Sequence, residues 1–374
     1  SEVLANYASA VESPHDFLWQ RGASRYVEAS RDFGGGDGGE AGSVPEMDPP
    51  TSREIAVNAM TPVYRMLLRL RVRWTRGLEM EADFWRQMLS PDPVENPKLA
   101  RLEHWLATGE VTWSLEGDDL CAFVGDARQR GSRGVPRMLN VGSGPFAPRP
   151  LDCALAMGVL PRSAARRGDE ERLPWPVPVE AADGLARFFV RVLDANELSP
   201  LYVPTQCVVE EVHTCFPLGH FDVVHMRNSL DHAFDPLLGI ERMLQVVRPG
   251  GWVLLRHARN EGIPGKFRNG LHQWAFDAEI VGALGGEHDG QELSFVAWNP
   301  DLRLDVTAYL LSTGLAAHVR TELHAHPSAD APPDEKYVWV DIRRPTEEEA
   351  AERLASLSSP AAGDAAAAPP VVLG

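Results

Sequence analysis

The sequence predicts a doubly wound α/β fold, and two segments carry the prediction. The first is Leu139–Phe146, a short apolar strand that ends in a glycine turn. Because glycine has no Cβ, the backbone of such a turn can approach a ligand closely. The second segment, residues 220–257, has the order strand, polar loop, helix, Pro-Gly-Gly break and strand. In folds of this class, ligands bind outside the carboxyl ends of the strands.

The second segment also carries a family resemblance. Its strands are expected at His220–Met226 and Trp252–His257, with a helix at Pro236–Val247 and the break at Arg248–Gly251. The sequences "FDVV" and "VVRPGGWVLL" resemble strands 4 and 5 of class I S-adenosylmethionine-dependent methyltransferases, and the resemblance spans about Arg137 to Arg344. It implies a seven-stranded Rossmann-like sheet, S-adenosyl-L-methionine as cofactor and S-adenosyl-L-homocysteine as product.

Three shorter segments resemble a bacterial-type, methyltransferase type 11-like subgroup. Its members combine RNxLDH, NEG and GLHQW sequences, which stand here at Arg227–His232, Asn260–Gly262 and Gly270–Trp274. This resemblance implies no particular substrate.

Composition limits the classes of partner. A net charge of −17 argues against a nucleic-acid partner, because affinity for phosphates comes from clustered lysine and arginine. No apolar run approaches the roughly 20 residues of a membrane helix, and Ser1–Leu4 shows no secretory signal. We therefore expect a cytoplasmic enzyme with a small-molecule substrate and no membrane partner; the oligomeric state is not predicted.

The four cysteines predict no metal site. They show neither CxxC nor CxxH spacing, so we expect buried free thiols in a reducing compartment. The cysteines are Cys121, Cys153, Cys207 and Cys215.

Three regions are expected along the chain. Residues 1–130 form a helical cap with a flexible loop at Asp32–Gly39, and residues 131–345 form the catalytic domain. Residues 346–374 are rich in Ala and Pro and are expected to be a disordered tail.

The cap is expected to hold several helices. Thr61 is predicted as an N-cap with Pro62 in the first turn. Trp74–Gly77 is predicted as a break at which Arg76 contacts substrate, and a second helical segment follows. This second segment is expected at 78–89, and further helical segments are expected at 98–107 and 118–127.

In the catalytic domain, residues 147–186 exceed what one helix needs and are interpreted as a surface insertion. Strand 2 is then expected at Arg187–Leu193 and strand 3 near Gln206–Val209. Beyond strand 5, Asn299–Asp301 predicts a hairpin. The two edge strands of the sheet are expected at 318–324 and 336–342.

The cofactor residues are carried over from the resemblance. Asn140 stands where the family usually has an acid, and Phe146 where a third glycine is common. Asp194 would accept hydrogen bonds from the ribose hydroxyls, and Glu211 would pair with the adenine amino group. The full predicted set is Asn140, Gly142, Ser143, Gly144, Asp194, Ala195, Glu211, Val212, Arg227 and Asn228.

The acceptor site is expected in the loops after strands 4 and 5. Methyl transfer is an in-line displacement that depends on alignment, and a neutral nucleophile also needs a base. Asp231, His232 and His272 are the predicted catalytic residues. The predicted substrate contacts are Asn260, Glu261, Trp274 and Arg76. Whether the acceptor is oxygen, nitrogen or sulfur stays open.

Two alternatives remain at this stage. One is a methyltransferase-like binding or scaffold protein without catalysis, which Asn140, Phe146 and the insertion would permit. The other is an NAD(P)-dependent oxidoreductase, which would favour a third glycine opening the helix and does not predict the Pro-Gly-Gly break.

Overall fold

The computed structural model describes most of the chain from residue 52 onward, and the side chains of its first helix from Leu70. The described residues are 52–96, 98–108, 115, 117–131, 134–145, 150–153, 175–198, 203–264, 266–267, 270–280, 293–326 and 335–358. The predicted loop Asp32–Gly39, Phe146 and the tail beyond residue 358 lie outside these ranges.

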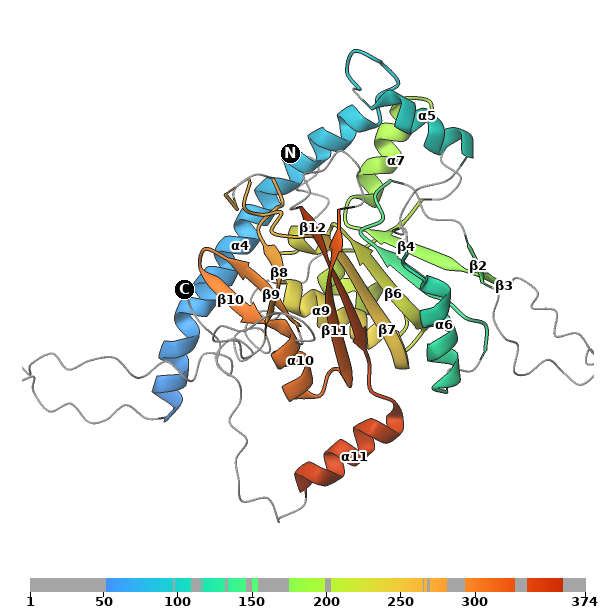
Figure 1. The fold of residues 1–374 in the computed structure, drawn as a ribbon. Helices are drawn as coiled ribbons and strands as arrows, with labels where there is room; N and C mark the ends of the chain where they lie inside the picture. Colours follow the sequence, from blue (N-terminus) through green and yellow to red (C-terminus); the bar gives the residue numbers. More distant parts are fainter. Residues whose placement is uncertain are drawn as a thin grey trace, which may run out of the picture.

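A seven-stranded sheet forms the centre of the molecule, as predicted (Figure 1). Its order is β11-β12-β7-β6-β1-β4-β5. The five strands from β7 to β5 are parallel, and β12 runs antiparallel to both β7 and β11. The strands are β1 Met138–Val141, β4 Val179–Asp183, β5 Thr205–Gln206, β6 Phe221–Arg227, β7 Val247–Ala258, β11 His318–Ala325 and β12 Lys336–Arg343.

Helices cover both faces of this sheet. Neighbouring residues of a strand point to opposite faces, so Val223 packs with α6 while Val224 packs with α9. The helices are α4 Ser52–Met88, α5 Leu99–Thr108, α6 Leu120–Gln129, α7 Ala186–Ala195, α8 Val212–Cys215, α9 Pro236–Val246, α10 Val306–Thr313 and α11 Glu347–Ser358. Two 3₁₀ turns are η2 Val209–Glu211 and η3 Leu230–His232. None of the described helices combines the length and apolar character that crossing a bilayer requires.

Two smaller sheets accompany the main one. The predicted hairpin is confirmed: β9 (Leu293–Asn299) pairs antiparallel with β10 (Leu302–Asp305) and with β8 (Ala275–Ile280). The strands β2 (Leu151–Cys153) and β3 (Trp175–Val177) form an antiparallel pair of their own.

The prediction of strand 2 is wrong. Residues 187–193 lie within α7, where Phe188, Phe189, Val192 and Leu193 are buried at helical spacing. The strand beside β1 is β4, which the sequence placed inside the 147–186 insertion. The apolar run was long enough for a strand, and its period of three to four residues identifies it as a helix.

The helix α4 also corrects the prediction, because it is continuous. It passes through Thr61, which is therefore no N-cap, and through Trp74–Gly77, where a break was expected. Gly77 is needed for packing: a Cβ there would lie 2.4 Å from the carbonyl oxygen of Gly270. The glycine lets the loop that carries His272 lie against the helix (Figure 1).

Two region boundaries change. The helix α6 was assigned to the cap, but it packs on the sheet, and Asp126 accepts a hydrogen bond from the indole nitrogen of Trp252 at 2.8 Å. The predicted disordered tail from residue 346 begins with a helix, α11. Thr346 starts it by donating from its backbone to Glu349, which accepts a hydrogen bond from Arg343 as well.

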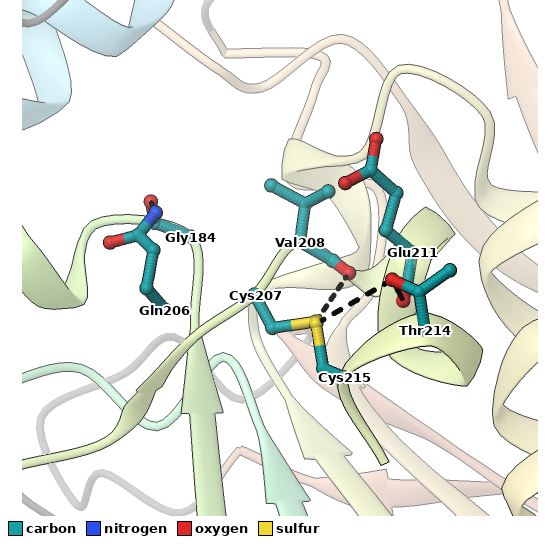
Figure 2. The surroundings of a disulfide bond; sticks show 7 residues. All are labelled: Gly184, Gln206, Cys207, Val208, Glu211, Thr214 and Cys215. Atoms are coloured by element: carbon teal, nitrogen blue, oxygen red, sulfur yellow. Dashed lines mark hydrogen bonds between the residues drawn. A yellow bond between two sulfur atoms is a disulfide. The ribbon is translucent and has the colours of Figure 1, made fainter. Parts of the chain in front are cut away.

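The expectation of free thiols is wrong, because all four cysteines form disulfides. Cys121 of α6 pairs with Cys153 of β2, and Cys207 pairs with Cys215 of α8. Figure 2 shows the second bond joining the segment after β5 to α8, with the carboxylate of Glu211 directed away from it. Cysteine usage therefore no longer supports a reducing compartment.

Candidate active site

A pocket lies at the carboxyl ends of β1, β4 and β6, with α4 as its opposite wall. It holds about 680 Å³ of empty space, part of it open to solvent. Its lining residues are Trp74, Leu78, Glu81, Trp85, Val141, Gly142, Gly144, Asp183, Gly184, Leu185, Cys207, Val208, Val209, Glu210, Met226, Asn228, Ser229, His232, Ala233 and Leu271. This is where a doubly wound sheet binds its ligands.

The glycine turn is held against β4 by its own amides. Gly142 and Ser143 both donate to the carbonyl oxygen of Ala182, at 2.8 and 3.2 Å. Gly142 has φ 66° and Gly144 has φ 73°, a region in which glycine is favoured. A Cβ on Gly142 would lie 2.1 Å from the hydroxyl oxygen of Ser229. Because these amides already donate within the protein, the backbone groups that the turn offers a ligand are its carbonyls.

Asp183 is the last residue of β4, the strand that takes the place predicted for strand 2. The sequence prediction missed this acid. Its carboxylate accepts hydrogen bonds from the amides of Gly144 at 2.9 Å and Leu185 at 2.8 Å. Burial raises the pKa of Asp183 to about 6, although these hydrogen bonds oppose the shift. The signal was present in the sequence as an acid followed directly by Gly184.

Asp194 and Ala195, predicted in this role, lie elsewhere. Both are exposed at the carboxyl end of α7 and neither lines the pocket. This correction follows from the corrected position of the strand beside β1. That strand is β4, and its last residue is Asp183.

Glu211, the acid predicted for adenine, does not line the pocket, whereas its neighbour Glu210 does. Glu210 lines the pocket and accepts hydrogen bonds from the amides of Phe234 at 2.8 Å and Asp235 at 3.1 Å. Burial raises the pKa of Glu210 to about 8. Glu211 is half-buried outside the pocket lining, and Val212 is fully buried in the core.

Two residues that follow β6 line the pocket: Asn228, which was predicted, and Ser229, which was not. Asn228 lines the pocket at φ 44°, while its side chain accepts from the amide of Ala258 at 2.9 Å and donates to the hydroxyl of Tyr337. Ser229 also lines the pocket, and its hydroxyl oxygen is buried without a hydrogen-bond partner among the described residues.

Three other predicted cofactor residues are absent from the pocket lining: Asn140, Ser143 and Arg227. Asn140 is buried, and its amide oxygen lies 3.1 Å from Nδ1 of His225. Asn140 is thus held in a buried pairing between β1 and β6.

The three predicted catalytic residues are brought together. Nδ1 of His272 lies 2.5 Å from Oδ2 of Asp231, and Nε2 of His232 lies 3.7 Å from the same oxygen. The two imidazole rings are 4.6 Å apart between centroids, at 76°. Asp231 is 1% exposed and His232 lines the pocket.

The electrostatics of this cluster follow from burial and proximity. Burial alone would raise the pKa of Asp231, but the charge of His232 and the hydrogen bond of His272 lower it to about 2. Burial alone would lower the pKa of His272, but the hydrogen bond and charge of Asp231 raise it to about 9. Burial, reinforced by the charge of Asp231, raises the pKa of Glu261 to about 7.

Of the four predicted substrate contacts, one is supported by its proximity to the cluster of Asp231, His232 and His272. The other three are not. Glu261 interacts electrostatically with the cluster. Asn260 is held by Asp277 at 3.0 Å and by the indole of Trp298 at 3.1 Å. Trp274 is fully buried in the core, and Arg76 is exposed on α4 outside the pocket.

The charge of the pocket is one-sided. Its ionisable lining residues are His232 and the acids Glu81, Asp183 and Glu210; Glu210, whose pKa burial raises to about 8, is mostly protonated at neutral pH. Among the described residues that line it, none is a lysine or an arginine. The site therefore favours a ligand with positive charge over one that carries phosphates.

No protein-family profile and no curated protein matches the chain. Among solved structures it is similar to the CurJ carbon methyltransferase, with 14% identity, 80% of this chain and 72% of that chain covered, and a TM-score of 0.32. It is also similar to the N-methyltransferase NodS from Bradyrhizobium japonicum in complex with S-adenosyl-l-homocysteine, with 14% identity, coverages of 66% and 97%, and a TM-score of 0.29.

A third similar structure is the T. Thermophilus 16S rRNA methyltransferase RsmC in complex with AdoMet and guanosine, at 13% identity and a TM-score of 0.26. The chain spans only 39% of that protein and 47% of the citrinin polyketide synthase CMeT domain. Similarity at this level carries no argument about the reaction, so the function is inferred from the pocket.

Proposed function

We propose that this protein transfers a methyl group from S-adenosylmethionine to a small-molecule acceptor by in-line displacement. One observation carries the proposal: the pocket at the glycine turn has a buried acid, Asp183, at the end of β4, and none of the described residues in its lining is a lysine or an arginine. S-adenosylmethionine is positively charged at its sulfonium and amino groups, and it has a ribose diol that an acid can hold.

The chain's residues fit each part of this cofactor. The Asp183 carboxylate would accept from the ribose hydroxyls, and the carbonyls of the glycine turn would accept from the amino group. The unpartnered hydroxyl of Ser229 would donate to the methionine carboxylate. Leu185 and Val208 provide apolar surface for the adenine.

The same features disfavour a nicotinamide cofactor. Its pyrophosphate requires backbone amides or basic side chains. Here the amides of Gly142, Ser143 and Gly144 donate to Ala182 or Asp183 of β4, and the described lining residues include no lysine or arginine.

When bound, S-adenosylmethionine supplies a methyl group on a positively charged sulfur that is attacked in line. Trp74 and Leu78 of α4 and Leu271 would exclude water above it. Asp231, His232 and His272 would orient the acceptor, and His232 or Glu261 would take up its proton.

A small acceptor suits this arrangement better than a nucleic acid. The pocket is closed on one side by α4 and is lined by acids, and the whole chain carries a net charge of −17. A polyanionic substrate would be repelled from such a surface.

Isothermal titration tests the cofactor. S-adenosylmethionine and S-adenosylhomocysteine should bind with 1:1 stoichiometry, and NADH and NADPH should not. Asp183→Ala should weaken binding by about 10- to 100-fold, the loss expected for hydrogen bonds to a charged group. Asp194→Ala is the matched control and should bind like the wild type, because Asp194 is exposed on α7. Equal losses in both variants would contradict the assignment.

A second experiment separates an enzyme from a catalytically inactive binding protein. The protein is incubated with methyl-labelled S-adenosylmethionine and a metabolite pool, and label is followed into small molecules. Cofactor binding without any transfer would favour the scaffold alternative.

A further inference from the structure

We propose that Asp231, His232 and His272 bind a divalent transition-metal ion, and that this ion holds an acceptor hydroxyl beside the methyl donor. The metal site stands on geometry alone; the role of the ion rests on the proposed function. The cysteine spacing predicted no metal, but the candidate ligands here are a carboxylate and two imidazoles.

The three ligand atoms already lie close together. One atom from each residue can be chosen so that all lie within 4.8 Å of one another. Oδ2 of Asp231 is 2.5 Å from Nδ1 of His272 and 3.7 Å from Nε2 of His232. Ligands bound to one ion at about 2.0–2.2 Å are separated by roughly 3–3.5 Å in tetrahedral geometry. The distance between Asp231 and His272 is shorter than this range and the 4.8 Å limit of the group is longer, so the side chains must shift to bind one ion; the His272 side chain is 31% exposed.

Two polar atoms of the cluster lack hydrogen-bond partners. Asp231 is 1% exposed, and its Oδ1 has none. Nε2 of His232 is likewise buried without a hydrogen bond. Buried polar atoms are normally paired, because leaving them unpaired costs free energy. A cation held by Oδ2 of Asp231 and the imidazoles would give Nε2 of His232 a partner, and bidentate binding by the carboxylate would engage Oδ1 as well.

The donor set indicates the kind of ion. Two imidazoles and one carboxylate suit Zn²⁺, Mn²⁺, Fe²⁺ or Co²⁺ better than Mg²⁺ or Ca²⁺, which prefer oxygen ligands. Three protein ligands leave at least one position open, as in catalytic sites. Since His232 lines the pocket, that open position would be available to an acceptor in the pocket.

This placement selects an acceptor that carries a hydroxyl. A hydroxyl bound to such an ion loses its proton more readily, and the proton would pass to Glu261 or to water. In the transfer step the oxygen forms a bond to the methyl carbon and the carbon–sulfur bond breaks. The bonding pair stays on sulfur, so the sulfonium becomes the neutral thioether of S-adenosylhomocysteine.

The test begins with metal binding in the absence of the methyl donor. Chelator-treated protein is titrated with Zn²⁺ and Mn²⁺ by calorimetry, and with Co²⁺ by absorption spectroscopy. We expect one ion per chain and a Co²⁺ spectrum of nitrogen and oxygen ligands without a thiolate charge-transfer band. No binding of any of these ions by the wild type, or a spectrum with thiolate character, would overturn the proposal without the need for a variant.

The variants His232→Ala, His272→Ala and Asp231→Asn should each weaken binding by about 100-fold or more, since loss of an outer-shell partner alone costs 10- to 100-fold. His220→Ala is the control, because His220 lies at the opposite end of β6 beside Glu180. Circular dichroism confirms folding. Unchanged metal affinity in all three variants would overturn the site.

Two outcomes keep this proposal and the proposed function apart. If S-adenosylmethionine fails to bind while the metal binds, the proposed function fails and the metal site stands. If methyl transfer proceeds at full rate in chelator, the ion has no role in holding the acceptor, and a hydrogen-bonded Asp231–His272 pair acts alone.

Discussion

The carboxylate of Asp183, the last residue of β4, accepts a hydrogen bond at 2.9 Å from the amide of Gly144, in the turn that follows β1. The two strands are parallel neighbours, so this bond joins the two chain segments on which a ligand would rest. The same carboxylate faces the pocket, and its protonation is therefore linked to ligand binding.

Binding of S-adenosylmethionine should weaken as the pH falls through about 6. The pKa of Asp183 is raised to about 6 by burial, so below this pH the group is protonated and offers one acceptor fewer to the ribose. Calorimetry between pH 5 and pH 8 measures the effect. Asp183→Asn should bind more weakly throughout and show no such dependence. A wild-type affinity independent of pH would exclude Asp183 as a ligand.

Gly142→Ala should destabilise the protein and weaken cofactor binding more than Gly219→Ala. Both positions have positive φ, at 66° and 62°, so both substitutions cost about 1–2 kcal/mol of backbone strain. Only at Gly142 would the new Cβ meet Ser229, at 2.1 Å, whereas nothing lies within 4 Å at Gly219. Thermal melting and calorimetry should show the difference, and Ser229→Gly should restore part of the loss at Gly142.

Gly77→Ala should destabilise the protein even though alanine favours helices by about 1 kcal/mol. The added Cβ would lie 2.4 Å from the backbone oxygen of Gly270, and a backbone contact cannot rotate away. The neighbouring Arg76→Ala serves as the control: Arg76 is exposed, so its melting temperature should match that of the wild type. A stabilising Gly77→Ala would mean that the loop does not pack on α4.

Asp118→Asn should cost about 1.5–3 kcal/mol of unfolding free energy, the loss expected for hydrogen bonds to a charged group, because the buried guanidinium of Arg256 loses one carboxylate partner and keeps Asp341 at 2.9 Å. Arg256 is fully buried and donates to both oxygens of Asp118 at 2.9 Å. The exposed pair of Arg86 and Asp83 provides the comparison. Asp83→Asn should change stability by about 1 kcal/mol or less. Urea unfolding of both variants distinguishes the two environments.

Stability should fall as the pH rises toward about 8, through Glu210. The folded protein holds this group with a pKa raised by burial to about 8, above its ordinary 4.5. The folded state therefore keeps a proton that the unfolded chain releases, and the stabilisation present below about pH 4.5 is lost by about pH 8. Glu210→Gln should flatten this part of the profile of melting temperature against pH. An unaltered profile would contradict the buried, protonated state.

The sheet could be predicted from the sequence where strands carry strong apolar patterns and clear turn residues. Strands 4 and 5, the helix between them and the edge strands are confirmed for that reason. The predicted break at Arg248–Gly251 is not: these residues belong to β7, whose pairing with β6 shifts register there. Strand 2 was missed because β4, Val179–Asp183, is short and contains Glu180, so its pairing with β1 decides its conformation. The aromatic run in α7 was the stronger local signal for a strand.

The candidate site was predicted where residues follow strand 4 directly. Asp231, His232 and His272 converge because two loops meet at one end of the sheet. Ser229 follows strand 4 by two residues and was overlooked, although the same rule covers it. Glu81 could not be found in this way, because its place in the pocket depends on how α4 packs on the sheet. The disulfides could not be found either, since cysteine spacing alone does not define pairing.

One wall of the pocket comes from α4, which carries Trp74, Leu78, Glu81 and Trp85 over three successive turns. Occupancy of the pocket and docking of this helix on the sheet are consequently linked equilibria. A ligand that binds between the helix and the sheet stabilises the docked helix. A change that weakens docking of the helix therefore weakens ligand binding by the same coupling free energy. Protection of α4 from proteolysis should therefore rise in step with ligand saturation.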